Sequence, residues 1–238
     1  MPRSGRAVAP LAASVSPLTA PERVLFAGEA GDIETLIERP AGAPRAIGIS
    51  CHPHPLFGGT LTNKVIHTVS RAFLAAGALA IRFNFRGVGA SGGTHDHGEG
   101  EMRDLCALVA EARARWPQQP LWLSGFSFGA WVSLRAQGML APALLVSVAP
   151  PVGRWDFSRV EPPRCPWLVI QGERDELVDA AAVARWVKDL APRMPVSPEL
   201  LSVAGAEHFF HGRLHEVSDA VAGFIRRADC TPPRAPYG

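Results

Sequence analysis

Short apolar, β-branched runs alternate with helical periods along most of this chain, and Gly and Pro separate them. This alternation is typical of a parallel sheet whose strands are connected by helices. Two early runs, residues 23–28 and 32–39, flank a turn at 29–31 and predict an antiparallel hairpin. We therefore expect an α/β fold with a mostly parallel sheet of about seven or eight strands, an N-terminal antiparallel hairpin and helices on both faces.

The chain length fits one domain of this class. With 238 residues, of which 47% are apolar, the chain can bury a sizeable core. We expect residues 22–229 to form a single domain between tails at 1–21 and 230–238. The alternative for the first tail is a secretion signal, because Arg3 and Arg6 precede an Ala/Val/Leu-rich stretch. Pro10 and Pro17 interrupt that stretch and favour a tail.

Charge and cysteine usage narrow the range of partners. The net charge is only +2 and the basic residues are scattered, which gives no footprint for nucleic acid. No run reaches the length of a membrane span. The cysteines do not have metal-ligand or redox-motif spacing, so we expect free thiols and a cytoplasmic location. They are Cys51, Cys106, Cys165 and Cys230. A homodimer remains open.

The pentapeptide Gly-Phe-Ser-Phe-Gly, centred on Ser127, is the strongest chemical signal. It follows an apolar run at residues 121–124 and precedes a helical segment, which is the context of a serine nucleophile on a tight strand-to-helix turn. The helix start also offers backbone N–H groups beside a developing negative charge. The alternative is a turn serine that only caps the helix.

A serine hydroxyl needs a neighbouring base, which a third group holds in the correct tautomer. Asp175 and His208 each follow a predicted strand and are in the expected order, so we assign Asp175 as the acid and His208 as the base. Asp179 and Glu173 are alternatives to Asp175, although Asp179 is better explained as a helix N-cap.

The oxyanion hole requires two backbone donors. The first is the N–H of Phe128, which follows the serine, and the second comes from the loop after the third strand. In that loop Pro53 and Pro55 have no N–H. The candidates are therefore His54, Leu56 and Phe57, and we favour His54.

Several polar groups near these motifs have simpler structural explanations. For Arg86 we favour an ion pair with Glu101 or Asp104 over a substrate carboxylate. Residues 95–97, His-Asp-His, are expected to form a solvated loop tip. His211 and His215 could share a helical face, but a zinc site lacks further ligands at suitable spacing, so we predict no metal.

Five sequence motifs follow one another between residues 47 and 224. They are His-Pro-His-Pro-Leu-Phe-Gly-Gly from His52, Arg-Phe-Asn-Phe-Arg-Gly-Val-Gly from Arg82, Gly-Phe-Ser-Phe-Gly from Gly125, Ala-Pro-Pro-Val from Ala149 and His-Phe-Phe-His-Gly from His208. With these motifs the chain resembles the small bacterial α/β-hydrolases of the dienelactone-hydrolase-like group. The resemblance implies the α/β-hydrolase fold, a Ser127–Asp175–His208 triad and no cofactor. Dienelactone hydrolases proper use cysteine as nucleophile, so their substrate does not carry over.

The substrate site is expected to be open. About seventeen residues separate the strand that ends near Val148 from the next one, too few for the helical lid of larger hydrolases. The expected lining residues are Phe57, Phe126, Pro150, Trp155 and Phe157.

These features predict a serine hydrolase that cleaves a small or medium carboxylic ester through an acyl-enzyme. Thioester hydrolysis and acyl transfer would use the same residues. A different class of function, a catalytically silent binding protein on the same fold, also remains open.

Overall fold

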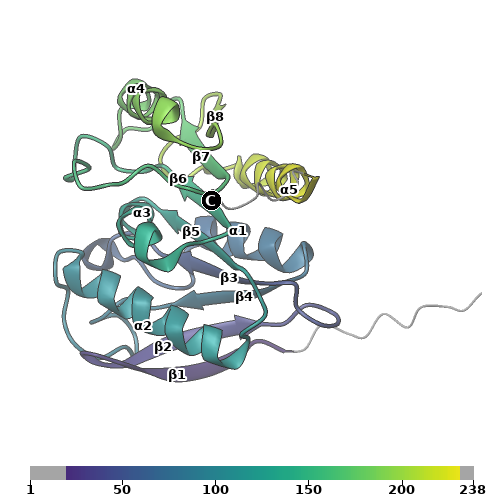
Figure 1. The fold of residues 1–238 in the computed structure, drawn as a ribbon. Helices are drawn as coiled ribbons and strands as arrows, with labels where there is room; N and C mark the ends of the chain where they lie inside the picture. Colours follow the sequence, from purple (N-terminus) through teal and green to yellow (C-terminus); the bar gives the residue numbers. More distant parts are fainter. Residues whose placement is uncertain (1–19, 231–238) are drawn as a thin grey trace, which may run out of the picture.

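The computed structural model describes residues 20–230. Its centre is an eight-stranded sheet in the order β1-β2-β4-β3-β5-β6-β7-β8 (Figure 1). The strands are β1 (Glu22–Gly28), β2 (Gly31–Glu38), β3 (Ala46–Cys51), β4 (Ala78–Phe83), β5 (Leu121–Phe126), β6 (Leu144–Val148), β7 (Trp167–Gly172) and β8 (Glu199–Val203). β2 pairs antiparallel with β1 and β4, and all other neighbours are parallel. The predicted fold class, including the hairpin, is confirmed.

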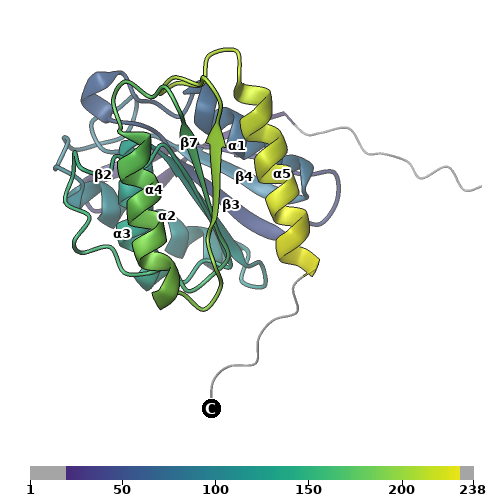
Figure 2. The same ribbon diagram turned by 90° about the horizontal axis from the view of Figure 1, so that it is seen from above.

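Helices cover both faces of the sheet (Figure 2). They are α1 (Lys64–Ala75), α2 (Glu99–Arg115), α3 (Phe128–Leu140), α4 (Ala180–Leu190) and α5 (Leu214–Cys230), with short 3-10 helices η1 (Pro55–Phe57) and η2 (Ala191–Arg193). Residues of α2, α3 and α4 belong to one buried apolar cluster, and those of α1 and α5 belong to a second. These two clusters form the core on opposite faces of the sheet.

Local sequence explains how the first helix begins and which side it buries. The Asn63 side chain accepts from the N–H groups of Val65 and Ile66, which have no partner within the first helical turn. Val65, Ile66, Val69 and Phe73 recur at helical spacing and are buried against the sheet. One amphipathic stripe therefore fixes both the start and the packing of α1.

Parallel strands place the loops after β3, β5, β7 and β8 at one edge of the sheet. These loops carry His54, Ser127, Asp175 and His208. Between β6 and β7, residues 149–166 contain no helix, and the chain is held by an isolated bridge between Val152 and Trp155. Within residues 20–230 the fold therefore has no lid over this edge, as predicted.

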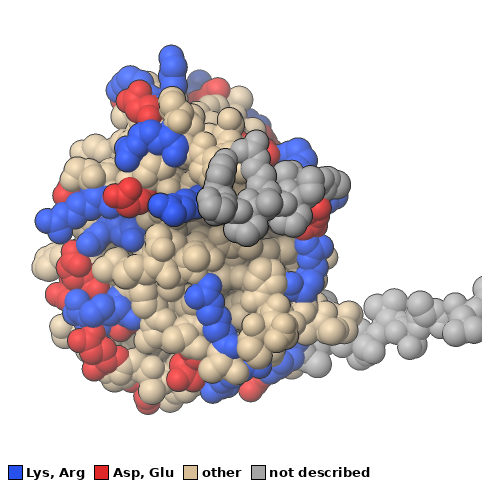
Figure 3. All heavy atoms as spheres, in the orientation of Figure 1, with Lys and Arg blue, Asp and Glu red and all other residues tan. Residues whose placement is uncertain are grey.

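The described surface gives few further constraints. On the face in Figure 3, Lys and Arg are interspersed with Asp and Glu around a centre of uncharged residues. No helix within residues 20–230 combines the length and apolar character of a membrane span. Cys51, Cys106 and Cys165 are free thiols, as predicted. Most of the two predicted tails lies outside the described residues.

Candidate active site

Ser127 lies on a sharp turn between β5 and α3. Its backbone φ is positive, at 52° with ψ of −119°, which is uncommon for a residue with a side chain. The two flanking glycines allow this turn because the chain passes very close to them. A Cβ atom at Gly125 would lie 2.2 Å from the Gly129 oxygen, and one at Gly129 would lie 2.3 Å from the Cys51 oxygen. The turn therefore requires glycine at both positions.

The structure brings Ser127, His208 and Asp175 together from three loops. His208 Nε2 lies 3.0 Å from Ser127 Oγ, and His208 Nδ1 lies 2.8 Å from Asp175 Oδ2. The His208 and Asp175 side chains are almost fully buried. The imidazole also packs against the Phe126 ring, with the centroids 5.0 Å apart. Each ring nitrogen of His208 thus has a hydrogen-bond partner, the Asp175 carboxylate at Nδ1 and the Ser127 hydroxyl at Nε2.

Asp175 accepts four hydrogen bonds, which fix its orientation. Oδ1 accepts from the N–H groups of Leu177 and Val178, and Oδ2 accepts from Gln171 Nε2 and His208 Nδ1. Burial by itself raises the pKa of Asp175, but the hydrogen bond and charge of His208 and the two backbone donors outweigh it, so the pKa is lowered. Asp175 is therefore a carboxylate at neutral pH.

The alternatives to Asp175 lie elsewhere. Asp179 is the N-cap of α4, where its side chain accepts from the N–H of Ala181 at 2.9 Å. Glu173 is exposed. Sequence reasoning missed Glu176, whose carboxylate accepts from the backbone N–H of His208 at 3.2 Å. Its position next to Asp175 was a signal in the sequence, but its contact with His208, 32 residues away, is visible only in the structure.

Hydrogen bonds within the loop show which of the candidate N–H groups are free to bind an oxyanion. The N–H of Leu56 donates to His54 Nδ1, and the N–H of Phe57 donates to the His54 carbonyl. Within residues 20–230, the N–H groups of His54 and Phe128 have no hydrogen-bond partner. Phe128 is the first residue of α3, where the amide has no acceptor in the helix. These two free amides are those assigned from the sequence.

His52, two residues before His54, organises the loop after β3. It is fully buried, its Nδ1 lies 2.6 Å from the Pro53 carbonyl oxygen, and its Nε2 accepts from the N–H of Phe85 at 3.0 Å. This pattern requires the neutral ring with its proton on Nδ1. The histidine ties the loop to the end of β4, and sequence analysis did not assign it a role.

Acid pH is expected to destabilise the fold through His52. Burial lowers the pKa of His52 from 6.5 to about 4, although the bond to Pro53 raises it in part. Between these pH values the unfolded chain binds a proton that the folded chain does not, so the free energy of unfolding falls by about 3 kcal/mol as the pH decreases. Urea unfolding at pH 7 and pH 4.5 measures this loss. His52→Gln should show a smaller loss, and equal losses in both proteins would contradict the assignment.

The predicted substrate-lining residues fall into two groups. Phe57 is 86% exposed and its ring lies 4.7 Å from that of His54. Trp155 is partly exposed, and its ring lies 5.5 Å from that of His54 and 5.3 Å from that of Phe128. Both rings therefore lie next to the side chains of the two residues with free amides, and both are open to solvent.

The other lining predictions need correction. Phe126 is fully buried as the last residue of β5, and it supports the His208 ring instead of lining a cleft. Pro150 is buried. The Phe157 ring packs edge-on against Trp186 of α4, 4.9 Å away, and with it lines a separate hollow.

The loop after β4 confirms one prediction and corrects another. Arg86 forms a two-pronged ion pair with Asp104, through hydrogen bonds of 2.9 and 2.8 Å. The expectation of an internal ion pair is thus confirmed. The His95 side chain, however, is only 8% exposed and bonds to Glu101, so the solvated loop tip predicted at residues 95–97 is wrong for His95.

His211 and His215 do not share a helical face. His211 precedes α5 and is paired with Glu207, whereas His215 lies within the helix. Among residues 20–230, no group of three or more His, Cys, Asp and Glu side chains is arranged to hold a metal ion.

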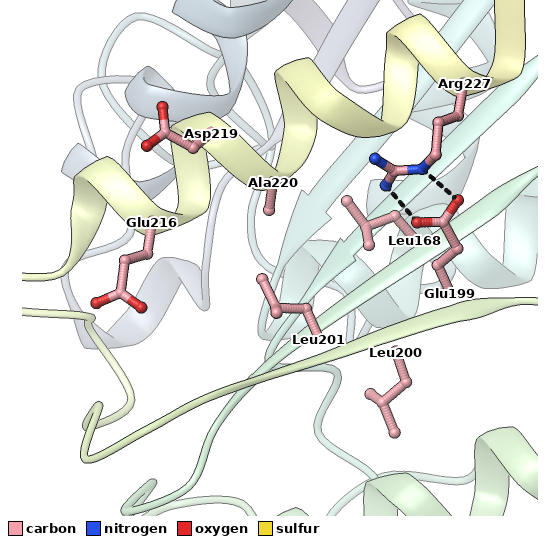
Figure 4. A pocket seen from close by; sticks show the side chains of 8 residues that line it. All are labelled: Leu168, Glu199, Leu200, Leu201, Glu216, Asp219, Ala220 and Arg227. Atoms are coloured by element: carbon pink, nitrogen blue, oxygen red, sulfur yellow. Dashed lines mark hydrogen bonds and ion pairs between the residues drawn. The ribbon is translucent and has the colours of Figure 1, made fainter.

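A further hollow of about 420 Å³ lies between β8 and α5 (Figure 4). Leu168 and Leu201 form its apolar wall, and Glu216 and Asp219 project from the helix. Arg227 and Glu199 pair at one end. None of the predicted site residues lines this hollow, so it is separate from Ser127.

Comparison with known proteins points to one group. No protein-family model matches the chain. The structure of a lid-less α/β serine hydrolase from Xanthomonas campestris is 40% identical, with a TM-score of 0.82 over 92% of this chain and 100% of that chain. An α/β serine hydrolase homologue from Coxiella burnetii is 41% identical, with a TM-score of 0.78 over 87% and 99%. An uncharacterized protein from Rickettsia prowazekii is 31% identical over 210 residues, or 85% of this chain and 88% of that protein.

Proposed function

The chain belongs to the small α/β serine hydrolases, and we propose that it hydrolyses carboxylic esters through an acyl-enzyme on Ser127. One observation carries the proposal. Ser127 Oγ, His208 and Asp175 form a continuous hydrogen-bonded line with distances of 3.0 and 2.8 Å. Beside that line are two amide groups without a partner in the described chain. Nucleophile, base, orienting carboxylate and oxyanion donors are the full set that acyl transfer requires.

The first half of the reaction forms the acyl-enzyme. Ser127 Oγ attacks the ester carbonyl carbon while His208 Nε2 takes the hydroxyl proton. The carbonyl oxygen becomes negative and accepts from the N–H groups of Phe128 and His54. The bond to the leaving alcohol then breaks as His208 returns the proton to that oxygen. Asp175 stabilises the imidazolium throughout.

Water completes the cycle by the same steps. His208 removes a proton from water, which attacks the acyl carbon, and Ser127 leaves as its hydroxyl is reprotonated. The acid product is released and no external oxidant, reductant or cofactor enters the balance. The exposed Phe57 and the absence of a lid favour short or medium acyl groups, which reach the site directly from solvent.

A fluorophosphonate probe followed by intact-mass analysis tests the proposal. We expect one adduct on wild type, none on Ser127→Ala and one on the control Ser202→Ala, because Ser202 is an exposed residue of β8. A folded wild-type protein without an adduct would contradict an activated serine. That result would favour the silent binding function.

A panel of matched oxygen esters and thioesters then distinguishes substrate classes. We expect butyrate esters to be cleaved faster than long-chain esters, because no lid forms a long apolar channel. Faster cleavage of the long-chain ester would contradict the open site, and a strong preference for thioesters would change the assigned substrate class.

A further inference from the structure

We propose that His95, anchored by buried Glu101, is a positioning residue for the two oxyanion donors. The inference deepens the proposed function and rests on it. His95 lies on the loop before α2, a long way along the chain from the other site residues. Its ring centroid lies 4.8 Å from that of His54 and 5.7 Å from that of Phe128. One side chain thus contacts both residues whose free amides face the developing oxyanion.

Glu101 gives this imidazole a rigid support. The Glu101 side chain is fully buried. Oε1 lies 2.7 Å from His95 Nδ1 and accepts from the N–H of Asp96 at 3.0 Å, and Oε2 accepts from the N–H of Gly98 at 2.8 Å. A buried carboxylate with several donors is held far more firmly than an exposed pair, because losing any donor leaves buried charge unsatisfied. His95 therefore has a defined orientation, with Nδ1 donating to Glu101.

The same loop is pressed against the start of α3. Gly98 has φ of 94°, and a Cβ atom there would lie 2.1 Å from Cζ3 of Trp131. The Trp131 ring lies 5.8 Å from that of Phe128 and 4.9 Å from that of Trp155. Glu101 thus connects the loop, the first turn of α2 and the rings around Phe128 in one packed unit.

The position of the two N–H donors affects the rate, because stabilisation of the oxyanion depends strongly on where they lie. Loss of one donor costs about 10² to 10³ in kcat, and misplacement by about 1 Å can cost 10². The His54 ring is packed among the rings of His95, Phe128 and Trp155, and among these only His95 is anchored by a buried carboxylate. If His95 positions these donors, its loss should impair the transition state more than substrate binding.

The first test is His95→Ala, with His215→Ala as the control at an exposed histidine of α5. For a butyrate ester we expect kcat to fall about tenfold or more, with KM within about twofold. Affinity for butaneboronic acid, whose serine adduct places an oxygen in the oxyanion hole, should fall by a similar factor. Melting temperature and the fraction of molecules labelled by fluorophosphonate verify folding. Unchanged kcat and boronate affinity would overturn the proposal.

Two further variants test the anchor. His95→Phe keeps a ring but cannot donate to Glu101, so we expect a loss similar to that of His95→Ala, and full wild-type kcat would overturn the role of Glu101. Glu101→Gln should lower kcat in the same way, whereas Glu99→Gln, at an exposed residue of the same helix turn, should not.

Different results would contradict the proposed function and the positioning role. A wild-type protein that is neither labelled nor active contradicts the proposed function and the positioning role with it. A labelled, active wild type with unchanged kinetics in His95→Ala contradicts the positioning role alone.

Discussion

Replacing Ser127 with alanine is expected to lower kcat for a butyrate ester by about a million-fold. The change removes the nucleophile oxygen, Ser127 Oγ, which lies 3.0 Å from His208 Nε2. It leaves the amides of Phe128 and His54 in place, so a residual rate above that in water, about 10³- to 10⁴-fold, should remain from the oxyanion hole and binding. The backbone φ at this position is positive, and alanine adopts this conformation with a strain similar to that of serine.

Hydrolysis of p-nitrophenyl butyrate under saturating conditions measures this loss, with thermal unfolding as the check on folding. Ser202→Ala should retain wild-type kcat because Ser202 is exposed on β8. A Ser127→Ala protein that keeps more than about one per cent of wild-type kcat would contradict a covalent mechanism on this serine.

The nucleophile turn could be predicted from sequence because its determinants are local. A strand, two glycines two positions from the serine, and a helix start define the turn, and all lie within a few residues of Ser127. Chain order extended the prediction to Asp175 and His208, which are 33 positions apart, because parallel strands deliver their loops to one edge. The parallel topology was therefore enough to predict that these two distant residues lie at the same edge of the sheet.

Predictions failed where the direction of a side chain decided its role. Phe126 adjoins Ser127, but it is the last residue of β5 and its ring points beneath His208, where substrate cannot reach it. Successive residues of a strand point to opposite faces, so proximity in sequence does not imply a shared surface.

The contact between His95 and Glu101 also escaped prediction, for a different reason. The loop between β4 and α2 is rich in glycine and has positive φ at Gly87, Gly89, Gly93 and Gly98. Glycine populates such conformations freely, so the local sequence does not determine the path of the loop. A polar His-Asp-His segment in such a loop favoured a solvated tip, whereas the buried Glu101 carboxylate draws His95 inward.

Replacing Asp175 with asparagine is expected to lower kcat by about 10⁴, because it reverses the hydrogen bond between this side chain and His208. Oδ1 of Asp175 accepts from the N–H groups of Leu177 and Val178, so the amide oxygen of asparagine must take that position. The amide NH₂ group then faces His208 Nδ1 and Gln171 Nε2. Facing a donor, Nδ1 becomes the acceptor and the imidazole proton moves to Nε2, where it points at Ser127. In that tautomer His208 cannot accept the proton of the serine hydroxyl.

Asp179→Asn is the matched control because this carboxylate lies four positions further along and caps α4. Asparagine caps helices about as well as aspartate, so its kcat should stay at the wild-type value. Steady-state kinetics with p-nitrophenyl butyrate compares both variants with wild type, and KM for Asp175→Asn should change little because the carboxylate lies behind the imidazole, away from substrate. If Asp175→Asn kept wild-type kcat and Asp179→Asn lost most of it, the assignment would be reversed. Asp179 would then be the carboxylate that orients His208.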